Sequence, residues 1–345
     1  IVIPTHERHH VLMRAVDYYS KIDVSVLIVD SSITSFKEKL PNDFDYLHLS
    51  SSFFGDKIHA ALCKVNTPYV CVCADDDFLA ENGLREGLKF LESHSEYVSV
   101  QGQYINFNSS NLKNNQPMYI DCINYKNDSS EIAERLKNCF NAPHVYALHR
   151  TVDLKHCLEI TINLSYIDIV EMCVPLVSLC IGKHKMLPVF WQARDRRRYT
   201  IYKDIEGNDY ILNEENIIST LSPSAVITDW SAYLQSNEGS QFRANFLSKV
   251  SSLISDSLNA DELFDLAFDF YFKRIQANSS LTLLQRIKNA MKVLLPEVIV
   301  KKIKARNVEK IVELKAKSGY PWNDDDAMKN WNLMEQSIIK FSNLH

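Results

Sequence analysis

The clearest chemical signal in the sequence is a run of three aspartates, Asp75 to Asp77. It directly follows Tyr69 to Ala74, a short apolar run that predicts a buried strand. Adjacent carboxylates repel one another unless a cation neutralises them. Mg²⁺ and Mn²⁺ prefer oxygen ligands, and one or two carboxylates commonly hold such an ion against the phosphates of a substrate. The pattern therefore predicts a divalent metal site; the alternative is that the acids only stabilise the N-terminus of the following helix.

Strands and helices that alternate along the chain must position this run. The predicted strands are residues 1–3, 24–29, 46–49, 69–74 and 97–103, and the predicted helices are residues 9–20, 56–64 and 83–93. Such alternation predicts an α/β fold with a doubly wound sheet. Ligands bind beyond the carboxyl ends of the strands in such sheets. We therefore expect Thr5, Asp30 and Asp75, each just past a predicted strand, to meet in one crevice.

The chain beyond residue 103 continues this domain and then changes character. A polar stretch at 104–130 is interpreted as an irregular excursion. Further strands are predicted at 145–148 and 185–192, and further helices at 131–139 and 163–180. From about residue 212 the pattern is helical throughout. We therefore predict an α/β domain over residues 1–211 and an α-helical C-terminal appendage over residues 212–345.

Composition excludes several protein classes. Hydrophobic residues make up 46% of the chain and charged residues 23%, as in ordinary globular proteins. The formal net charge of −5 provides no overall basic field, so we expect no nucleic-acid partner. Only 8 glycines are present, and neither a GxGxxG nor a Walker loop occurs. The best candidate for a membrane span, Ile167 to Ile181, is interrupted by two acidic residues, so no span is expected.

The cysteines indicate a reducing compartment. The chain has 8 of them, none in a CxxC pair, and most lie inside apolar runs. This distribution is typical of reduced thiols in a core. No leader segment with a small-residue cleavage site is apparent either. We expect a cytoplasmic protein.

A basic segment at 281–317 holds ten Lys and Arg residues against three Glu, interleaved with apolar residues. One interpretation is a solvated helix face that packs on the main domain. The other is peripheral attachment to an anionic membrane surface, at the inner face of the cell membrane.

Three motifs together resemble a known family. They are Ile1 to His6 (IVIPTH), Leu27 to Ser32 (LIVDSS), and Thr67 to Asp77 (TPYVCVCADDD). Their order and spacing resemble the GT-A-fold nucleotide-sugar glycosyltransferases of the family 2 type, most closely a bacterial subgroup of surface-glycan clusters. The resemblance covers about residues 1–200. It implies a GT-A, Rossmann-like, mostly parallel sheet flanked by helices.

The resemblance also assigns roles to the residues at the strand ends. Asp75 and Asp77 would hold Mn²⁺ or Mg²⁺ on the donor diphosphate, with Asp76 beside them. Asp30 would hydrogen-bond the nucleoside base, and Thr5 would line the base pocket.

The departing nucleoside diphosphate needs positive charge beyond the metal. Lys57 is one candidate. Arg194 is another, because the family often has a basic residue after the corresponding strand and arginine suits bidentate phosphate contacts. Arg194 opens a basic run that extends to Arg198, for which a solvated loop is the alternative interpretation.

Three histidines lie at the end of the first motif or just after it. His6 is next to Thr5 and is a candidate donor contact. His9 and His10 are interpreted as exposed residues at a helix start, and no HExxH metal motif is present.

Sugar transfer with inversion needs a carboxylate that deprotonates the acceptor hydroxyl. The resemblance places this base on a helix that matches Asp168 to Glu171. The two carboxylates share one helical face, and an ionised carboxylate in an apolar helix is costly without a partner or a task. Glu171 is favoured slightly over Asp168; the alternative is that either one pairs with a cation or caps the helix.

Together these observations predict a metal-dependent, NDP-sugar-dependent glycosyltransferase, a hexosyl- or related sugar transferase. It would move a sugar to a hydroxyl of a bacterial surface glycan, such as a capsule or an O-antigen, with a glycan or lipid-linked glycan as acceptor. Residues 212–345 would contact acceptor, membrane or another subunit. The alternatives are a nucleotidyltransferase on a similar fold and a non-catalytic module that binds a glycan or a partner.

Overall fold

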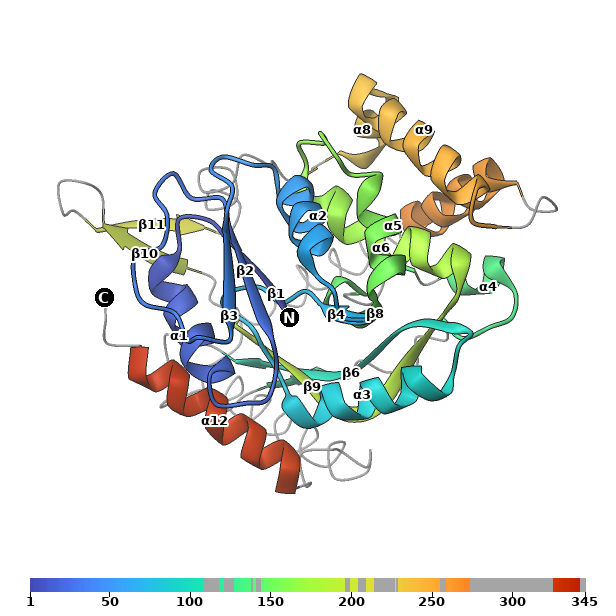
Figure 1. Ribbon diagram of the computed structural model, residues 1–345. Coiled ribbons are helices and arrows are strands. Elements are labelled where there is room, and N and C mark those ends of the chain that lie inside the picture. Colours follow the sequence, from blue (N-terminus) through green and yellow to red (C-terminus); the bar gives the residue numbers. More distant parts are fainter. Residues whose placement is uncertain are drawn as a thin grey trace, which may run out of the picture.

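The computed structural model is an α/β protein with two neighbouring sheets and a separate hairpin (Figure 1). It describes residues 1–107, 109, 118–120, 127–137, 139–140, 144–195, 199–203, 209–213, 227, 229–254, 259–273 and 325–341. The first sheet is parallel, has the order β1-β2-β3, and consists of Val2–Thr5 (β1), Val26–Asp30 (β2) and Phe44–His48 (β3). The central strand β2 is buried throughout, which explains its continuous apolar sequence.

The second sheet has the order β4-β8-β6-β9-β5, with β7 paired to β6. Its strands are Tyr69–Cys71 (β4), Phe78–Leu79 (β5), Tyr97–Phe107 (β6), Met118–Ile120 (β7), Leu148–Arg150 (β8) and Lys183–Asp195 (β9). A parallel bridge between Val2 and Val72 joins this sheet to β1. The backbone N–H of Cys73 also donates to the carbonyl of Val2 at 3.0 Å.

Most strands run in one direction, which confirms the predicted mostly parallel sheet. Strands β4 and β6 are both antiparallel to β8 and so run alike, and β9 is parallel to β6. The bridge from Val2 to Val72 gives β4 the same direction as β1, β2 and β3. The carboxyl ends of β1, β2 and β4 consequently lie along one edge of the combined sheet.

The helices of the α/β part pack against these strands. They are His9–Tyr19 (α1), Phe54–Lys64 (α2), Glu81–Ser93 (α3), Ile132–Leu136 (α4), Thr151–Glu159 (α5) and Ile167–Ile181 (α6). Helix α2 packs against β1 and β2, whereas α3 packs against β6 and β9. Helix α6 is apolar nearly all round because α2, α4 and α5 surround it.

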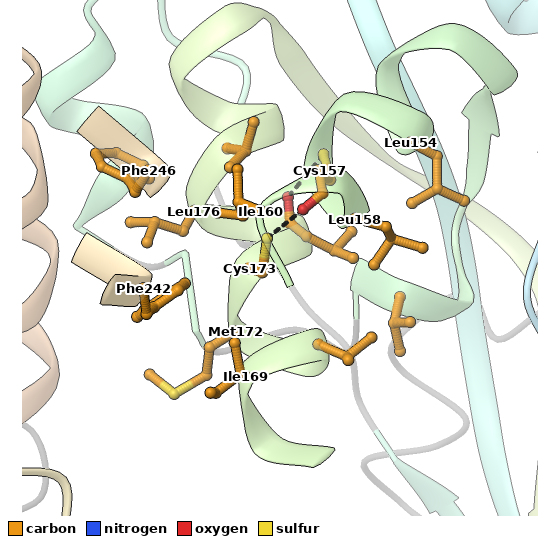
Figure 2. Close-up of a cluster of buried hydrophobic side chains, with 14 of the residues drawn as sticks. Leu154, Cys157, Leu158, Ile160, Ile169, Met172, Cys173, Leu176, Phe242 and Phe246 are labelled. Atoms are coloured by element: carbon orange, nitrogen blue, oxygen red, sulfur yellow. Dashed lines mark hydrogen bonds between the residues drawn. The ribbon is translucent and has the colours of Figure 1, made fainter. Parts of the chain in front are cut away.

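The described C-terminal helices pack at two separate places (Figure 1). Trp230–Gln235 (α8), Asn237–Ser251 (α9) and the helix at 260–273 share a hydrophobic core with α5 and α6. Figure 2 shows Phe242 and Phe246 of α9 beside Met172 and Leu176 of α6. Asp325–Phe341 (α12) instead lies along α1, in the core cluster on the other side. The division at residue 211 stays a prediction, but these helices do contribute to the cores of the α/β part.

Two local predictions are wrong. The segment predicted as a strand at 145–148 begins as a 3₁₀ turn, His144–Tyr146, and the strand starts only at Leu148. The stretch at 104–130 is not wholly irregular, because β6 extends to Phe107 and β7 lies within it. Both errors concern strands whose pairing with distant residues, rather than their own periodicity, decides their limits.

The helical pattern predicted from residue 212 also needs correction. Tyr199–Lys203 (β10) and Asp209–Asn213 (β11) form an antiparallel hairpin. The first helix described after this hairpin is α8. The basic segment 281–317 and Arg196 to Arg198 lie outside the described residues. Within the described part of the chain, no helix is both long and apolar enough to cross a membrane.

The described cysteines agree with the prediction of reduced thiols. Seven are free, and all of these except Cys63 are buried. Cys157 and Cys173 lie between α5 and α6, where each thiol donates to a backbone carbonyl (Figure 2).

A cluster of buried polar side chains lies between β6, β8 and β9. The rings of His144 and His184 are 4.2 Å apart, Ser99 Oγ is 2.8 Å from His184 Nδ1, and His149 Nε2 is 2.7 Å from the carbonyl of His144. One ring nitrogen of each histidine has no hydrogen-bond partner among the described residues. Burial lowers the pKa of His144 to about 3 and that of His149 to about 4, so these rings are neutral at pH 7.

Candidate active site

The predicted crevice residues meet at the shared strand edge. Thr5 and Asp30 are register partners at the ends of β1 and β2. The Thr5 hydroxyl donates to Asp75 Oδ2 at 2.7 Å. All three side chains are buried. The parallel order of β1, β2 and β4 therefore produces the cluster that the sequence predicts.

The acidic triad lies on the turn between β4 and β5. This turn is closed by the N–H of Asp77, which donates to the carbonyl of Ala74 at 3.1 Å. Asp75 and Asp77 are buried, whereas the side chain of Asp76 is 22% exposed. Burial raises the pKa of Asp75, and burial together with the charge of Asp76 raises that of Asp77 to about 8. A further cation beside the triad would favour the ionised carboxylates.

Arg8 is the triad's nearest cationic partner, and the sequence analysis did not single it out. Its guanidinium forms an ion pair with Asp75 Oδ1, and Nη1 lies 3.2 Å from Asp76 Oδ2. Arg8 is the N-cap residue of α1. No spacing rule could have found this contact, because it depends on β1 and β4 being neighbours in the sheet.

Strand β9 supplies the partners of the third aspartate. The N–H of Asp195 donates to Asp77 Oδ1 at 2.9 Å, and Gln192 Nε2 donates to Oδ2 at 3.1 Å. Arg194 Nε lies 3.5 Å from Oδ2 of the same carboxylate. The antiparallel pairing of β5 with β9 brings these residues to the triad. Arg194 therefore reaches the site for which it was predicted, and Gln192 is a partner that the sequence analysis missed.

Arg194 lies between two aromatic rings. Its guanidinium carbon is 5.5 Å from the centre of the Tyr104 ring and 5.0 Å from that of Tyr146. Burial opposes its charge, but Tyr146 and Asp77 outweigh this effect and raise the pKa of Arg194. The side chain is therefore a cation within cation–π distance of two aromatic rings.

Asp30 is held by three donors. Its Oδ1 accepts the N–H of Ser32 at 2.8 Å, and Oδ2 lies 2.7 Å from both the Tyr46 hydroxyl and His9 Nε2. Burial raises the pKa of Asp30, but these hydrogen bonds outweigh it and the net shift is downward. His9 does begin α1, as predicted, but the expectation that it is exposed is wrong, because its side chain is only 30% exposed and contacts Asp30.

Lys57 and His6 both contact Ser31, next to Asp30 in the chain. Lys57 lies within α2, and its Nζ donates to the carbonyl of Thr5 at 2.8 Å and to Ser31 Oγ at 2.9 Å. Burial lowers the pKa of Lys57 to about 8, although nearby carboxylates oppose the shift. His6 Nδ1 is 3.0 Å from Ser31 Oγ, and burial and the charge of Lys57 lower the pKa of its ring.

The two candidate bases on α6 differ in their surroundings. Asp168 is half-buried, and its Oδ2 accepts the N–H of Ile227 at 2.7 Å. Burial raises the pKa of Asp168. Glu171 is exposed, and its charge is one of those that raise the pKa values of Arg194 and Tyr146. The charges of Glu171 and Arg194 are therefore close enough to interact.

The triad has the chemistry of a divalent-cation site. Within the described residues, no group of three or more His, Cys, Asp or Glu side chains is placed to hold a metal alone. Mg²⁺ and Mn²⁺ need only one or two carboxylates when substrate phosphates complete the shell. Asp75 and Asp77 provide two buried carboxyl groups whose pKa values are raised chiefly by burial, and a bound cation would favour their ionised form. The donor set therefore fits such an ion.

No protein-family model and no curated protein sequence matches the chain. Among solved structures, the chain is similar to residues 1–349 of S. aureus TarS, with 13% identity, a TM-score of 0.43, and coverage of 78% of this chain and 88% of that one. The same fragment in complex with UDP-GlcNAc gives the same values. A longer TarS structure is 14% identical with a TM-score of 0.43, and the match covers 53% of it. At this level of similarity, function must be argued from the site itself.

Trp191, three residues before Arg194 on β9, lies in the core. Trp191 is fully buried, and its indole N–H donates to the carbonyl of Tyr146 at 2.9 Å. Trp191 is therefore a core residue and is not exposed for stacking on a sugar.

Proposed function

We propose that this protein is a metal-dependent glycosyltransferase of the GT-A type, which transfers a sugar from a nucleoside diphosphate donor. The observation that carries the proposal is the meeting of Thr5, Asp30 and the acidic triad at one strand edge, with Arg194 and Lys57 around them. This edge joins buried carboxylates for a cation to fixed cations for phosphates, as a diphosphate donor requires.

Each half of the donor would meet a different part of this edge. Asp75 and Asp77 would hold Mn²⁺ or Mg²⁺, which when bound neutralises the diphosphate and makes it a better leaving group. Arg194 is rigid between its two tyrosines and would contact phosphate oxygens through its planar guanidinium. The nucleoside would lie toward Thr5 and Asp30.

Lys57 and the residues around Asp30 would shape the nucleoside end. Lys57 fixes the loops after β1 and β2 by joining Thr5 and Ser31, and its positive charge remains close to the site. The hydrogen bonds to Asp30 from Tyr46 and His9 hold this carboxylate in one orientation. A nucleoside base that binds to Asp30 must therefore replace one of these hydrogen bonds or add another to them.

The acceptor side is assigned to Glu171. Its carboxylate is exposed and close enough to Arg194 to affect the pKa of the guanidinium. It would accept the proton of the acceptor hydroxyl while that oxygen bonds to the anomeric carbon and the bond from this carbon to the nucleoside diphosphate breaks. A single displacement of this kind inverts the configuration. Asp168 is a positioning residue in this scheme, since its carboxylate accepts the N–H of Ile227. We propose a hydroxyl of a bacterial surface glycan as the acceptor, with residues 212–345 helping to bind it.

A thermal-shift panel tests the proposal. The protein is heated with UDP, GDP, CDP or TDP, each with Mn²⁺, Mg²⁺ or EDTA. A ligand at 100 times its dissociation constant should stabilise the fold by about 2.7 kcal/mol. We expect one nucleotide to stabilise the protein only with metal, and this effect to disappear in Asp75→Asn.

The control variant is Asp261→Asn, which alters an exposed ion pair with Arg243. It should respond to nucleotide and metal as the unchanged protein does. A nucleotide shift that is equal in EDTA would remove the metal from the proposal. The absence of any shift would contradict nucleotide-sugar binding.

A further inference from the structure

Arg8 binds Oδ1 of Asp75, a carboxylate that the proposed divalent ion would also bind. Thr5 donates to Oδ2 of Asp75 from the buried side, and Arg8 forms its ion pair with Oδ1. Arg8 also reaches Oδ2 of Asp76, the one partly exposed carboxylate of the triad. One guanidinium thus contacts two neighbouring carboxylates, those of Asp75 and Asp76.

A divalent ion and this guanidinium cannot share Asp75 Oδ1 without strong repulsion. The ion would bind within about 2.2 Å of the oxygen, and its double charge would then lie next to the positive charge of Arg8. One of the two cations must therefore leave. Because Asp75 is buried, water cannot screen the repulsion effectively.

The other cations of the site are less able to move. Lys57 is 4% exposed and is held by both Thr5 and Ser31. Arg194 is held between two tyrosine rings. The side chain of Arg8 is 26% exposed, and Arg8 precedes α1 as its N-cap residue. Arg8 is therefore the cation that can swing away while the rest of the site stays in place.

We propose that Arg8 is a built-in competitor of the divalent ion: it closes Asp75 and Asp76 when no donor is bound, and it turns to the donor phosphates when the ion takes its place. The assignment of the phosphates rests on the proposed function; the competition between Arg8 and the ion does not. Planar guanidinium groups form paired hydrogen bonds with phosphate as readily as with carboxylate, so Arg8 keeps a partner in both states. Metal alone should then bind weakly, and metal with nucleotide should bind cooperatively.

Titration with Mn²⁺ alone tests the competition, followed by calorimetry or by the relaxation of water protons. Arg8→Gln removes the charge and keeps a polar side chain of similar length. We expect it to bind Mn²⁺ at least about tenfold more tightly than the unchanged protein. The control is Arg85→Gln, which alters an exposed pair with Glu81 and should leave Mn²⁺ affinity unchanged.

A second variant keeps the test valid if Arg8→Gln folds poorly. Arg8→Lys retains one positive charge but cannot bridge two carboxylates with a planar group. It should bind Mn²⁺ more tightly than the unchanged protein, by a smaller factor than Arg8→Gln. Unchanged or weaker Mn²⁺ binding in both folded variants would overturn the proposal.

Repeating the titration with the nucleotide chosen by the thermal-shift panel tests the second half. The nucleotide should tighten Mn²⁺ binding in the unchanged protein more than in Arg8→Gln, because only the former must move Arg8. An equal effect of nucleotide in both would overturn the transfer of Arg8 to phosphate. If no nucleotide binds at all but Arg8→Gln still binds Mn²⁺ more tightly, the proposed function fails and the competition stands.

Discussion

Two regions of the same combined sheet bury ionisable side chains in opposite ways. At the strand edge, buried acids have cationic partners: Asp75 pairs with Arg8, and Asp77 lies beside Arg194. Between β6, β8 and β9, His144 and His149 are equally buried, but their hydrogen-bond partners are the Asn127 amide and a backbone carbonyl, and burial lowers their pKa values. The first region thus places cations beside its buried acids, whereas the histidines of the second region are neutral at pH 7.

The difference shows how burial alone does not mark a functional site. Desolvation disfavours charge in both places, raising the pKa values of the aspartates and lowering those of the histidines. Only the strand edge adds a partly exposed carboxylate and a partly exposed guanidinium, Asp76 and Arg8, through which a ligand could enter. We therefore propose ligand binding at the strand edge, and we expect the histidine cluster to affect only the stability of the fold.

The largest expected effect concerns acid. The folded pKa values of His144 and His149 lie below the ordinary value of 6.5, so the unfolded chain binds more protons as the pH falls. Their contribution to stability is complete above about pH 6.5 and is lost progressively toward their folded pKa values. Each should cost about 3 kcal/mol of unfolding free energy between pH 7 and pH 4. Urea denaturation at several pH values measures this loss.

The variant His149→Gln sharpens this comparison. Its amide can still donate to the carbonyl of His144 but does not titrate, so the loss of stability with acid should be smaller. The aspartates act in the opposite sense: because the folded pKa of Asp77 is raised to about 8, its protonation stabilises the fold as the pH falls. An unchanged pH dependence in His149→Gln would show that the histidine cluster is not responsible.

Asp77→Asn should separate function from stability. We expect transfer to fall by about 10³-fold, because one metal ligand and a preorganised charge are lost. We also expect the metal-free protein to become more stable by about 2 kcal/mol, because Asp77, whose pKa is raised to about 8, must take up a proton on folding near pH 7, whereas asparagine need not. Rates of donor hydrolysis and transfer, together with denaturation in EDTA, measure both. Full activity in this variant would place the metal elsewhere.

Glu171→Gln should lower kcat by about 10²-fold or more while leaving nucleotide binding intact, because a general base acts only in the chemical step. Asp168→Asn should have a smaller effect on kcat, because its carboxylate accepts a backbone N–H. The pH dependence of kcat is the second readout, since loss of a base removes its acid limb. A larger loss in Asp168→Asn than in Glu171→Gln would reverse the assignment.

Arg194→Lys should have the smallest of these effects. Lysine keeps the charge but loses the planar group between Tyr104 and Tyr146, so nucleotide affinity should fall about tenfold. Calorimetric titration with the nucleotide and Mn²⁺ measures the change. Affinity equal to that of the unchanged protein would show that the charge alone suffices.

The sequence predicted the parts of the site that follow from local pattern. Continuous apolar runs predicted β1, β2 and β4, because a strand covered on both faces has no polar side to alternate with. The polar residue that ends each run predicted the crevice, because parallel strands end at a common edge. The helix at 163–180 was also predicted, since an apolar segment of this length bounded by polar residues favours a buried helix.

Other features were decided only by the tertiary structure. Arg8 pairs with Asp75, 67 residues away, and Arg194 with Asp77, more distant still. The helix α12 packs along α1, and Lys340 reaches Asp17 over 323 residues. Sequence periodicity reports which face of an element is buried, but not against which element. The acidic triad could therefore be found in the sequence, whereas its pairing with the Arg8 guanidinium became apparent only after β1 and β4 were placed side by side.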